Sequence, residues 1–287
     1  MTKQTKTIKK IKTIGVFYNP EKSGLQKIFD ELEIWALKHK ISLKFISNWQ
    51  SRELALTIEN LDFAICLGGD GTILSVGRFL AGTNIAILGV NLGRLGFLAE
   101  INKQDLNAEL DNILSCKDYK IETRYILDIK VVRENKIFKE HLCINDIAVK
   151  NGEKSRIIDI DLFIDSEFVV RYVGDGLIVS TPTGSTAYSL AAGGPIVYPD
   201  LSVFVITAIC PHTLNLRPLV VQSDKKLEVQ VLEQKDMVLS IDGQISEKLF
   251  LNDKILITKS RKTMKLFTSQ NYSYFDVLRK KLSWGNR

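Results

Sequence analysis

Five apolar residues followed at once by a glycine-rich turn constrain the fold of this chain more than any other feature. The run Phe63–Leu67 fits a fully buried strand, and Gly68–Thr72 then reads Gly-Gly-Asp-Gly-Thr. Three glycines within four positions allow a sharp turn and leave no side chains in the way of a close ligand. Residues 72–80 predict a helix whose N–H groups open toward the turn. Such backbone forms an anion site, most often for phosphate.

Asp70 is the residue of this turn that does not suit a simple phosphate site. A carboxylate repels phosphates unless it accepts a proton or faces a metal ion. The turn therefore predicts chemistry on a phosphate group, with Asp70 as a base or as a partner of Mg²⁺. The alternative is a tight turn whose aspartate caps the helix.

Two better-known phosphate sites are excluded by the glycine spacing. The chain contains no Gly-x-x-x-x-Gly-Lys-Ser/Thr string, which excludes a Walker-type P-loop. Residues 89–96, Gly-Val-Asn-Leu-Gly-Arg-Leu-Gly, follow a strand-like run, but their first glycine spacing does not fit Gly-x-Gly-x-x-Gly. An ordinary Rossmann fingerprint is therefore not supported.

Length, charge and cysteine usage limit the function classes. A chain of 287 residues is long enough for two domains, and no apolar stretch reaches the ~18–20 residues that span a bilayer. The net charge of +6 is spread along the chain without a basic stripe, so we expect neither nucleic-acid nor membrane partners. The basic N-terminus lacks the apolar core of a secretory signal, and the four cysteines show no metal or disulfide spacing. We therefore expect a cytoplasmic protein.

The pattern of apolar residues changes near residue 119. Residues 1–118 alternate strand and helix signals, including helices from Pro20 to Lys38 and from Asp105 to Leu114, which predicts a parallel, Rossmann-like α/β domain. Residues 119–268 alternate with a period of two, which predicts an all-β, antiparallel second domain. Residues 269–287 end the chain with a helix expected to pack on the first domain through Phe275, Leu278 and Leu282.

A second unusual stretch, Ser180–Tyr188, reads Ser-Thr-Pro-Thr-Gly-Ser-Thr-Ala-Tyr. Hydroxyl residues surround a turn, and a helix is predicted from Thr186 to Ala192, so amides and hydroxyls there could hold ribose or phosphate oxygens. Tyr188 could stack on a base. The alternative is a well-capped helix in a loop.

Smaller polar signals occur within the predicted β domain. Asn145 and Asp146 interrupt an apolar run, which suggests a hydrogen-bonding task at a sheet end or a solvated strand end. Asp175 lies between two glycines, in a pattern that also fits a bulge or turn. Asp242-Gly243-Gln244 predicts a hairpin turn. Arg156 is either a phosphate or carboxylate contact or an exposed edge-strand arginine.

Taken in order, these stretches resemble the NAD kinase family, in its bacterial ATP-NAD kinase form. The resemblance covers roughly residues 60–245. The Gly-Gly-Asp-Gly turn alone is weak evidence, because lipid kinases and phosphofructokinases have similar loops, whereas the Ser180–Tyr188 string is highly specific. The matching stretches are 67–72, 89–98, 145–146, 174–188, 193–195 and 211–214.

The resemblance implies transfer of the ATP γ-phosphate to the 2′-hydroxyl of the adenosine ribose of NAD, giving NADP. It implies that Asp70 is the catalytic base, that Asn145 and Asp146 hold ribose hydroxyls, and that Asp175 and Thr186–Ala191 hold the ends of NAD. It also implies Mg²⁺ or another divalent cation with ATP, no metal site of the protein itself, and a homo-oligomer, dimer or tetramer. The implied nucleotide-binding residues are Gly68, Gly69, Asp70, Gly71, Thr72, Phe97, Asn145, Asp146, Arg156, Asp175, Thr183, Thr186, Ala187, Tyr188, Ser189, Leu190, Ala191 and Gln244.

Two positions depart from the family pattern, and two other functions compete with the main interpretation. Asp146 stands where the family often has Glu, and Val173 stands where many bacterial members have Arg. A lipid kinase of the diacylglycerol or sphingosine type would share the first loop, but it has no evident need for the Ser180–Tyr188 string. A non-catalytic nucleotide-binding sensor could tolerate Asn or Ser in place of Asp70.

Overall fold

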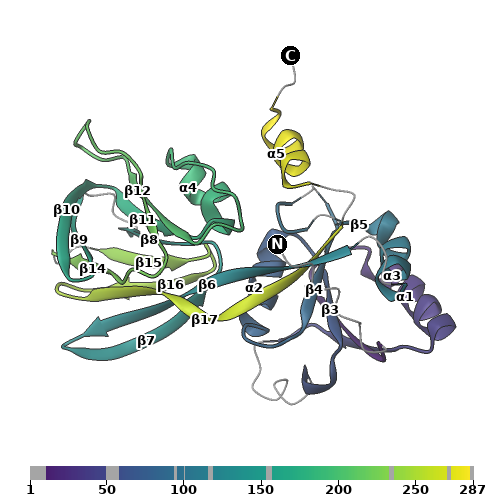
Figure 1. Ribbon diagram of the computed structural model, residues 1–287. Helices are drawn as coiled ribbons and strands as arrows, with labels where there is room; N and C mark the ends of the chain where they lie inside the picture. Colours follow the sequence, from purple (N-terminus) through teal and green to yellow (C-terminus); the bar gives the residue numbers. More distant parts are fainter. Residues whose placement is uncertain are drawn as a thin grey trace. The chain divides into compact units, whose positions relative to one another are not determined.

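The computed structural model describes residues 11–49, 58–93, 96–99, 101–115, 119–152, 157–232, 236–269 and 273–284 (Figure 1). Contacts divide the chain into two compact units. Unit 1 comprises Met1–Thr123 and Met264–Arg287, and unit 2 comprises Arg124–Thr263. Two long strands, β6 (Tyr119–Arg133) and β17 (Lys254–Ser269), have residues in both units.

Unit 1 contains the predicted parallel sheet, with strand order β2, β1, β3, β4. The short strand β5 and the end of β17 pair with β4, both in the parallel sense. Every residue of β3 and β4 is buried, as expected for strands covered on both faces. The carboxyl ends of β3 and β4 therefore lie side by side. The bounds are β1 (Thr13–Tyr18), β2 (Ser42–Ile46), β3 (Phe63–Leu67), β4 (Ala86–Asn91) and β5 (Ile101–Asn102).

The helices of unit 1 pack apolar faces on this sheet. Helix α1 buries Leu32 and Trp35 in the same cluster as residues of β1, β3 and β4. It begins at Leu25 rather than at the predicted Pro20, because Gly24, at φ 77°, is left-handed and cannot belong to a right-handed helix. None of the described helices is long and apolar enough to cross a membrane. The bounds are α1 (Leu25–His39), α2 (Asp70–Phe79), α3 (Leu106–Leu114), α5 (Tyr274–Leu282) and two 3₁₀ turns, η2 (Ile58–Asn60) and η3 (Lys103–Asp105).

The C-terminal helix α5 is started by a capping box. Ser273 Oγ accepts the N–H of Asp276 at 3.1 Å, and Asp276 Oδ2 accepts the N–H of Ser273 at 3.0 Å. These bonds, with the guanidinium of Arg279, lower the pKa of Asp276 to about 2. The predicted packing face is partly wrong: Leu278 is buried, but Val277 is buried with it while Phe275 is exposed.

The described part of unit 2 is all β, apart from short helical turns between β11 and β12, and its strands form antiparallel sheets. One sheet has the order β13, β12, β11, β8, β15, β16, and a second antiparallel set has the order β10, β9, β14, β17, with β6 pairing with β17 and β7. The bounds are β7 (Lys136–Cys143), β8 (Asp146–Asn151), β9 (Ile158–Ile164), β10 (Glu167–Gly174), β11 (Gly176–Ser180), β12 (Val203–Ile209), β13 (Leu219–Gln222), β14 (Leu227–Val231), β15 (Met237–Ile241) and β16 (Ile245–Leu249).

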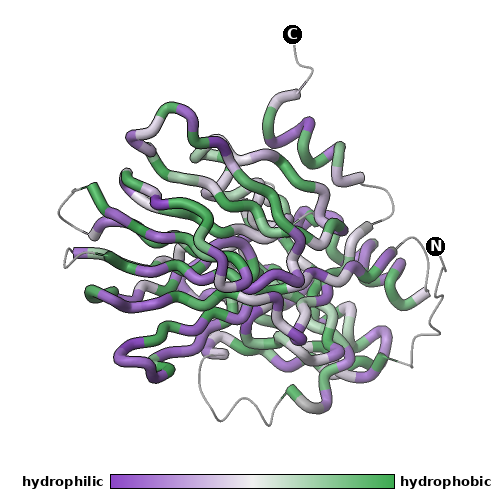
Figure 2. The backbone as a smooth tube through the Cα atoms, turned by 60° about the vertical axis from the view of Figure 1, so that its left-hand side comes forward, coloured by the Kyte–Doolittle hydropathy of each residue, from purple (hydrophilic) through white to green (hydrophobic). Residues whose placement is uncertain are grey.

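The two strand sets of unit 2 share one apolar core. Leu177 and Leu239 from the six-stranded sheet belong to the same buried cluster as Ile160, Val229 and Ile257 from the other set. Along β14 and β15 buried and half-buried residues alternate strictly, and in β14 the half-buried residues are the polar ones. Figure 2 shows hydrophobic and hydrophilic residues following one another along the backbone. The two-residue period of apolar residues in the sequence therefore arises because one face of each strand is buried and the other is not.

Helix α1 allows a matched test of this packing. We expect Leu32→Ala to lower the free energy of unfolding by about 2–5 kcal/mol, because it empties a fully buried position. Leu37→Ala, on the same helix but 82% exposed, should change it by less than about 0.5 kcal/mol. Urea unfolding followed by circular dichroism measures both. Equal effects of the two substitutions would contradict the assignment of the buried face.

Candidate functional site

The glycine-rich turn joins β3 to α2 with little room for side chains. Gly68 donates its N–H to the carbonyl of Val90 at 2.9 Å, which extends the pairing of β3 with β4 by one residue. A Cβ at Gly68 would lie 2.3 Å from Thr72 Oγ1, so this position requires glycine. Helix α2 begins at Asp70, two residues before the predicted start, with Gly69 at the N-cap in an extended conformation. The first N–H groups of a ten-residue helix therefore face the turn.

Asp70 does not cap this helix but binds a second loop of unit 1. Its Oδ2 accepts the N–H of Phe97 at 2.8 Å, and its Oδ1 accepts the N–H groups of Leu98 at 3.0 Å and Ala99 at 3.1 Å. The alternative in which the aspartate is only a helix cap is thus not what the structure shows. A carboxylate has about four lone-pair positions. The three N–H donors found among the described residues leave one of these positions, on Oδ2.

Gly96 is a functional candidate that was missed from the sequence. A Cβ there would lie 1.9 Å from Asp70 Oδ1, so only glycine lets the second loop close on the carboxylate. The signal was present in the second glycine-rich segment, which follows the next parallel strand. Its partner could not be known before the pairing of β3 with β4 was known.

A cation of α5 lies near this second loop. Lys281 Nζ is 5.7 Å from the centroid of the Phe97 ring, within the range of a cation–π contact. Unit 1 thus collects the predicted residues Gly68–Thr72 and Phe97, together with the unpredicted Gly96 and Lys281.

Asn145 and Asp146 lie at a strand end of unit 2. Strand β7 ends at Cys143 and β8 begins at Asp146, so Ile144 and Asn145 form a bend rather than the continuous strand suggested by the run of apolar residues. Asn145 Oδ1 is buried and has no hydrogen-bond partner among the described residues. A buried acceptor of this kind needs a donor from outside the described residues, such as a water molecule or the hydroxyl group of a ligand.

Asp146 is 5% exposed, and its carboxyl group holds its proton unusually strongly. Burial raises the pKa of Asp146 to about 7, the charge of Asp242 adds to the effect, and a hydrogen bond from the backbone of Tyr188 opposes it. Burial, with the charges of Cys210, Asp146 and Asp175, also raises the pKa of the Tyr188 phenol. These candidates therefore occupy one neighbourhood.

The hydroxyl-rich stretch forms two short turns and not the predicted helix from Thr186 to Ala192. The structure has a 3₁₀ turn, η4 (Thr183–Thr186), followed by the single turn of α4 (Tyr188–Ala191). Because α4 has only four residues, it does not provide the helix N-terminus that the sequence suggested. A Cβ at Gly184 would lie 2.1 Å from the carbonyl oxygen of Asn145, so this stretch and the Asn145 bend are in close contact.

Some hydroxyl groups of this stretch are buried within the protein, whereas others are accessible to solvent. Ser185 and Ser189 are fully buried, and Ser189 shares a 3.1 Å hydrogen bond with Thr207. Thr183, Thr186, Ala187 and Leu190 are half-buried, and Tyr188 and Ala191 are exposed. Lys150 Nζ lies 6.0 Å from the centroid of the Tyr188 ring.

The remaining candidates of unit 2 lie at turns. Asp175 joins β10 to β11 and donates its N–H to Ile209 at 3.0 Å. Gln244 is exposed in the turn between β15 and β16, as the hairpin pattern predicted. Arg156 lies outside the described residues.

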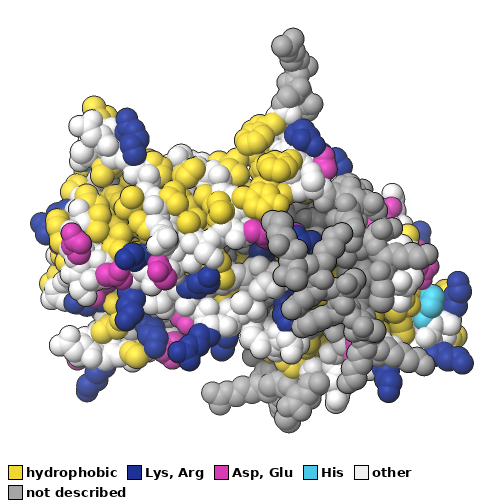
Figure 3. Space-filling model, viewed as in Figure 1, with side chains coloured by type: hydrophobic (Ala, Val, Ile, Leu, Met, Phe, Trp, Pro, Cys, Tyr) yellow, Lys and Arg dark blue, Asp and Glu magenta, His cyan; other side chains and the backbone are white. Residues whose placement is uncertain are grey.

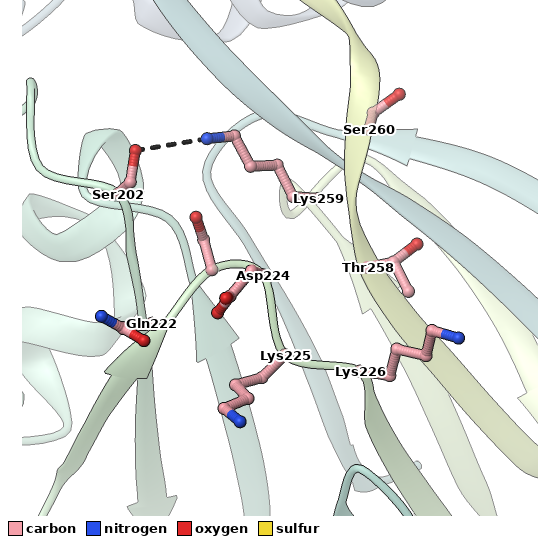
Figure 4. Close-up of a pocket in the computed structure, with 9 residues that line it drawn as sticks. Ser202, Gln222, Asp224, Lys225, Lys226, Thr258, Lys259 and Ser260 are labelled. Atoms are coloured by element: carbon pink, nitrogen blue, oxygen red, sulfur yellow. Dashed lines mark hydrogen bonds between the residues drawn. The ribbon is translucent and has the colours of Figure 1, made fainter.

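A separate polar groove of about 590 Å³ in unit 2 contains none of these candidates (Figure 4). Its lysines interact with neighbours: Lys259 donates to Ser202 at 3.2 Å, and Lys225 pairs with Asp165 at 2.9 Å. Figure 4 shows Lys225 and Lys226 extending away from each other. The arrangement does not converge on a ligand.

Comparison with known proteins supplies the context for this geometry. Residues 5–119 match the family model of the ATP-NAD kinase N-terminal domain, and residues 144–269 match that of the ATP-NAD kinase C-terminal domain. Proteins named NAD kinase from Geobacter metallireducens and Clostridium botulinum (strain Kyoto) are 38% and 40% identical to the chain. Each alignment covers 96% of this chain, with 100% of the Geobacter protein and 98% of the Clostridium protein.

Two solved structures share the fold. An NAD kinase from Archaeoglobus fulgidus in complex with ATP superimposes with a TM-score of 0.76 and 28% identity, over 94% of this chain and 98% of that one. Yeast NADH kinase complexed with NADH gives a TM-score of 0.85 at 22% identity, over 96% of this chain and 89% of that one. At this identity, the likeness to the yeast protein shows the fold alone.

The close approach of Gly96 to Asp70 gives a stability test. We expect Gly96→Ala to lower the free energy of unfolding by about 2–4 kcal/mol, because the new methyl group forces the carboxylate off its three N–H donors. Gly69→Ala is the matched control. A Cβ at Gly69 meets nothing within 4 Å, so we expect a loss below about 1 kcal/mol. Urea unfolding of both variants measures the difference, and an unaffected Gly96→Ala would remove the basis for the Asp70 cradle.

Proposed function

The chain belongs to the NAD kinase family, and we propose that it transfers the γ-phosphate of ATP to the 2′-hydroxyl of the adenosine ribose of NAD, producing NADP. Family membership makes it a phosphotransferase that acts on NAD. The position of attack and the roles of individual residues are the parts that we propose.

The single observation that carries the proposed chemistry is the orientation of Asp70. Three backbone N–H groups fix the carboxylate at the start of α2, and one lone pair of Oδ2 has no donor among the described residues. In the proposed step, the ribose 2′-oxygen forms a bond to the γ-phosphorus while the bond from that phosphorus to the β,γ-bridging oxygen breaks. ADP leaves with the bonding electron pair, and the hydroxyl proton passes to Asp70 Oδ2.

A carboxylate is a sufficient base for this step. Carboxylates are weak bases toward a hydroxyl group, with reference pKa values near 4. Phosphoryl transfer passes through a loose transition state, so the hydroxyl proton can leave late, as the new bond forms. Accurate positioning then contributes most, and the Asp70 cradle supplies it.

Mg²⁺ is assigned to ATP rather than to a site of the protein. Three lone pairs of Asp70 are taken by N–H groups. We therefore treat MgATP as the substrate, with the ion held mainly by phosphate and water oxygens. No step of the mechanism requires a protein-bound metal.

We assign the binding of NAD largely to unit 2. The unpartnered Asn145 Oδ1 and the buried carboxyl of Asp146 are suited to ribose hydroxyl groups. Asp175, Thr183 and the half-buried or exposed residues of Thr186–Ala191 are assigned to the remaining parts of NAD, with Gln244 near the same ligand. We assign Gly68, Gly69, Gly71, Thr72 and Phe97 of unit 1 to the nucleotide phosphates and the base. Val173 provides no charge at the position where many members have Arg.

We also propose that the protein acts in the cytoplasm as a homo-oligomer. Cys66, Cys143 and Cys210 are free thiols, which suits a reducing compartment. Figure 3 shows hydrophobic side chains gathered over the face of unit 2 that carries α4 and β12. Tyr198, Leu201 and Val220 of this unit are 42–52% exposed. Light scattering of the purified protein distinguishes a monomer from a dimer or tetramer.

The proposed base gives the first functional prediction. We expect Asp70→Asn to remain folded and to lose about 10²–10⁴-fold in kcat, because the amide cannot accept the hydroxyl proton. Its Oδ1 can still accept the N–H groups of Leu98 and Ala99, so the cradle largely persists. A coupled assay with MgATP and NAD, in which an NADP-specific dehydrogenase detects the product, measures kcat.

The same assay separates the competing functions. Near-normal turnover of a folded Asp70→Asn protein would contradict the assignment of the base. Calorimetric binding of NAD by the unsubstituted protein without formation of NADP from any phosphoryl donor would favour the sensor. Failure to bind NAD at all would reopen the lipid-kinase alternative.

A further inference from the structure

Asp242 is a buried carboxylate at a hairpin turn that does not itself need one. It lies between β15 and β16 at φ 51° and is 8% exposed. Asn or Gly also suits such a backbone conformation. Burying a charge is costly unless hydrogen bonds compensate for the lost water. The position of this carboxylate therefore calls for a reason beyond the turn.

Asp242 forms hydrogen bonds with consecutive residues at and beside the bend between β7 and β8. Oδ1 accepts the N–H of Asn145 at 2.7 Å, the N–H of Ile144 at 3.1 Å and the S–H of Cys143 at 3.2 Å. The backbone N–H of Asp242 donates to the carbonyl of Asp146 at 2.9 Å. One residue thus contacts four consecutive residues that lie almost 100 positions earlier in the sequence.

The bend is fixed from its other side by the hydroxyl-rich stretch. Thr181 Oγ1 donates to the carbonyl of Ile144 at 2.7 Å, and the N–H of Thr181 donates to the carbonyl of Asn145 at 2.8 Å. Thr181 therefore donates to the carbonyl groups of the bend, and Asp242 accepts the N–H groups of the bend. The side chain of Asn145 keeps its buried Oδ1 free of any described partner.

We propose that Asp242 is a positioning residue of the NAD site, which holds Asn145 and Asp146 in the arrangement that binds ribose hydroxyl groups. This inference rests on the proposed function, because it assigns a residue to the binding of the same substrate. Asp242 acts through the bend and does not itself touch the ligand.

The charge of Asp242 has a second effect on the same pair. Burial raises the pKa of Asp146 to about 7, the charge of Asp242 adds to this rise, and a hydrogen bond from the Tyr188 backbone opposes it. Two other titratable groups, Cys210 and Asp175, affect the neighbouring Tyr188, because their charges raise the pKa of its phenol. The ammonium group of Lys150 lies over the Tyr188 ring. Above pH 7 the ionised Asp146 is the stronger acceptor for a ribose hydroxyl. The KM for NAD should therefore fall as pH rises through 7.

The pH profile of KM tests this arrangement. In the unsubstituted protein we expect the KM for NAD to fall across a midpoint near pH 7, and Asp146→Asn should abolish the step. Asp242→Asn keeps an acceptor for the bend but removes the charge, so the midpoint should move to lower pH by about one unit. Asp242→Ala removes the acceptor, and we expect a rise in KM of about tenfold or more, with kcat changed far less.

Asp165→Asn is the matched control. Asp165 is also an aspartate at a turn of unit 2 with φ 51°, but it is exposed and paired with Lys225. Its substitution should leave both the KM and the midpoint unchanged. The proposal is overturned if Asp242→Asn and Asp242→Ala leave the KM within twofold of the unsubstituted protein and do not move the midpoint.

Two further comparisons cover the remaining outcomes. If Asp242→Ala does not fold, the conservative Asp242→Asn decides: a raised KM for NAD or a midpoint moved to lower pH supports the proposal, and the absence of both changes overturns it. If the unsubstituted protein makes no NADP, the proposed function fails, while calorimetric NAD affinity against pH still tests Asp242 on its own.

Discussion

The hydrogen bonds from Phe97, Leu98 and Ala99 to the Asp70 carboxylate are the interaction on which the geometry of unit 1 depends. They form only because β3 and β4 are adjacent and parallel, so that the loops after both strands emerge at the same edge. Gly68 and Gly96 make the contact sterically possible. The sheet order, two glycines and one carboxylate therefore form a single constraint, in which a change to any member disturbs the others.

Unit 2 uses buried carboxylates differently, to tie its turns to distant strands. Asp242 binds the bend after β7, and Asp253, which is 1% exposed, accepts the N–H of Phe250 at 2.9 Å and a two-pronged contact from Arg133. The guanidinium of Arg133 in turn lies 4.1 Å and 4.3 Å from the ring centroids of Phe138 and Phe250. In an antiparallel core of apolar side chains, such charged anchors give the turns a defined position that apolar packing alone does not provide.

The sequence predicted those parts of the fold that depend on local periodicity. The apolar run of β3 follows from burial on two faces, and the alternation along β14 follows from burial on one face. Element starts were less predictable: Gly24 delays α1, and the stretch after Thr183 forms two short turns because it closes on the Asn145 bend.

The sequence predicted a site residue only where the neighbouring residues in the chain already make its side chain unusual. Asp70 stood out because a carboxylate within a glycine-rich turn conflicts with a simple phosphate site. Gly96 and Asp242 did not stand out, because their significance lies in contacts with residues 26 and nearly 100 positions away. Periodicity carries no information about such pairs, and only the strand order brings them together.

The unequal sharing of donors between Asp242 and Asp146 shows how one site gives two identical side chains different properties. Asp242 receives two backbone N–H groups and a thiol S–H, which compensate for the loss of water around a charge. Asp146 is buried beside it with a hydrogen bond from the Tyr188 backbone, so neutralisation by a proton costs less than keeping a second negative charge. The Asp242 carboxylate thus fixes the geometry of the bend, whereas Asp146 has a pKa of about 7 and changes its charge near neutral pH. A ligand hydroxyl that donates a hydrogen bond to Asp146 stabilises the ionised form of its carboxyl group. NAD binding and the ionisation of Asp146 are therefore thermodynamically linked.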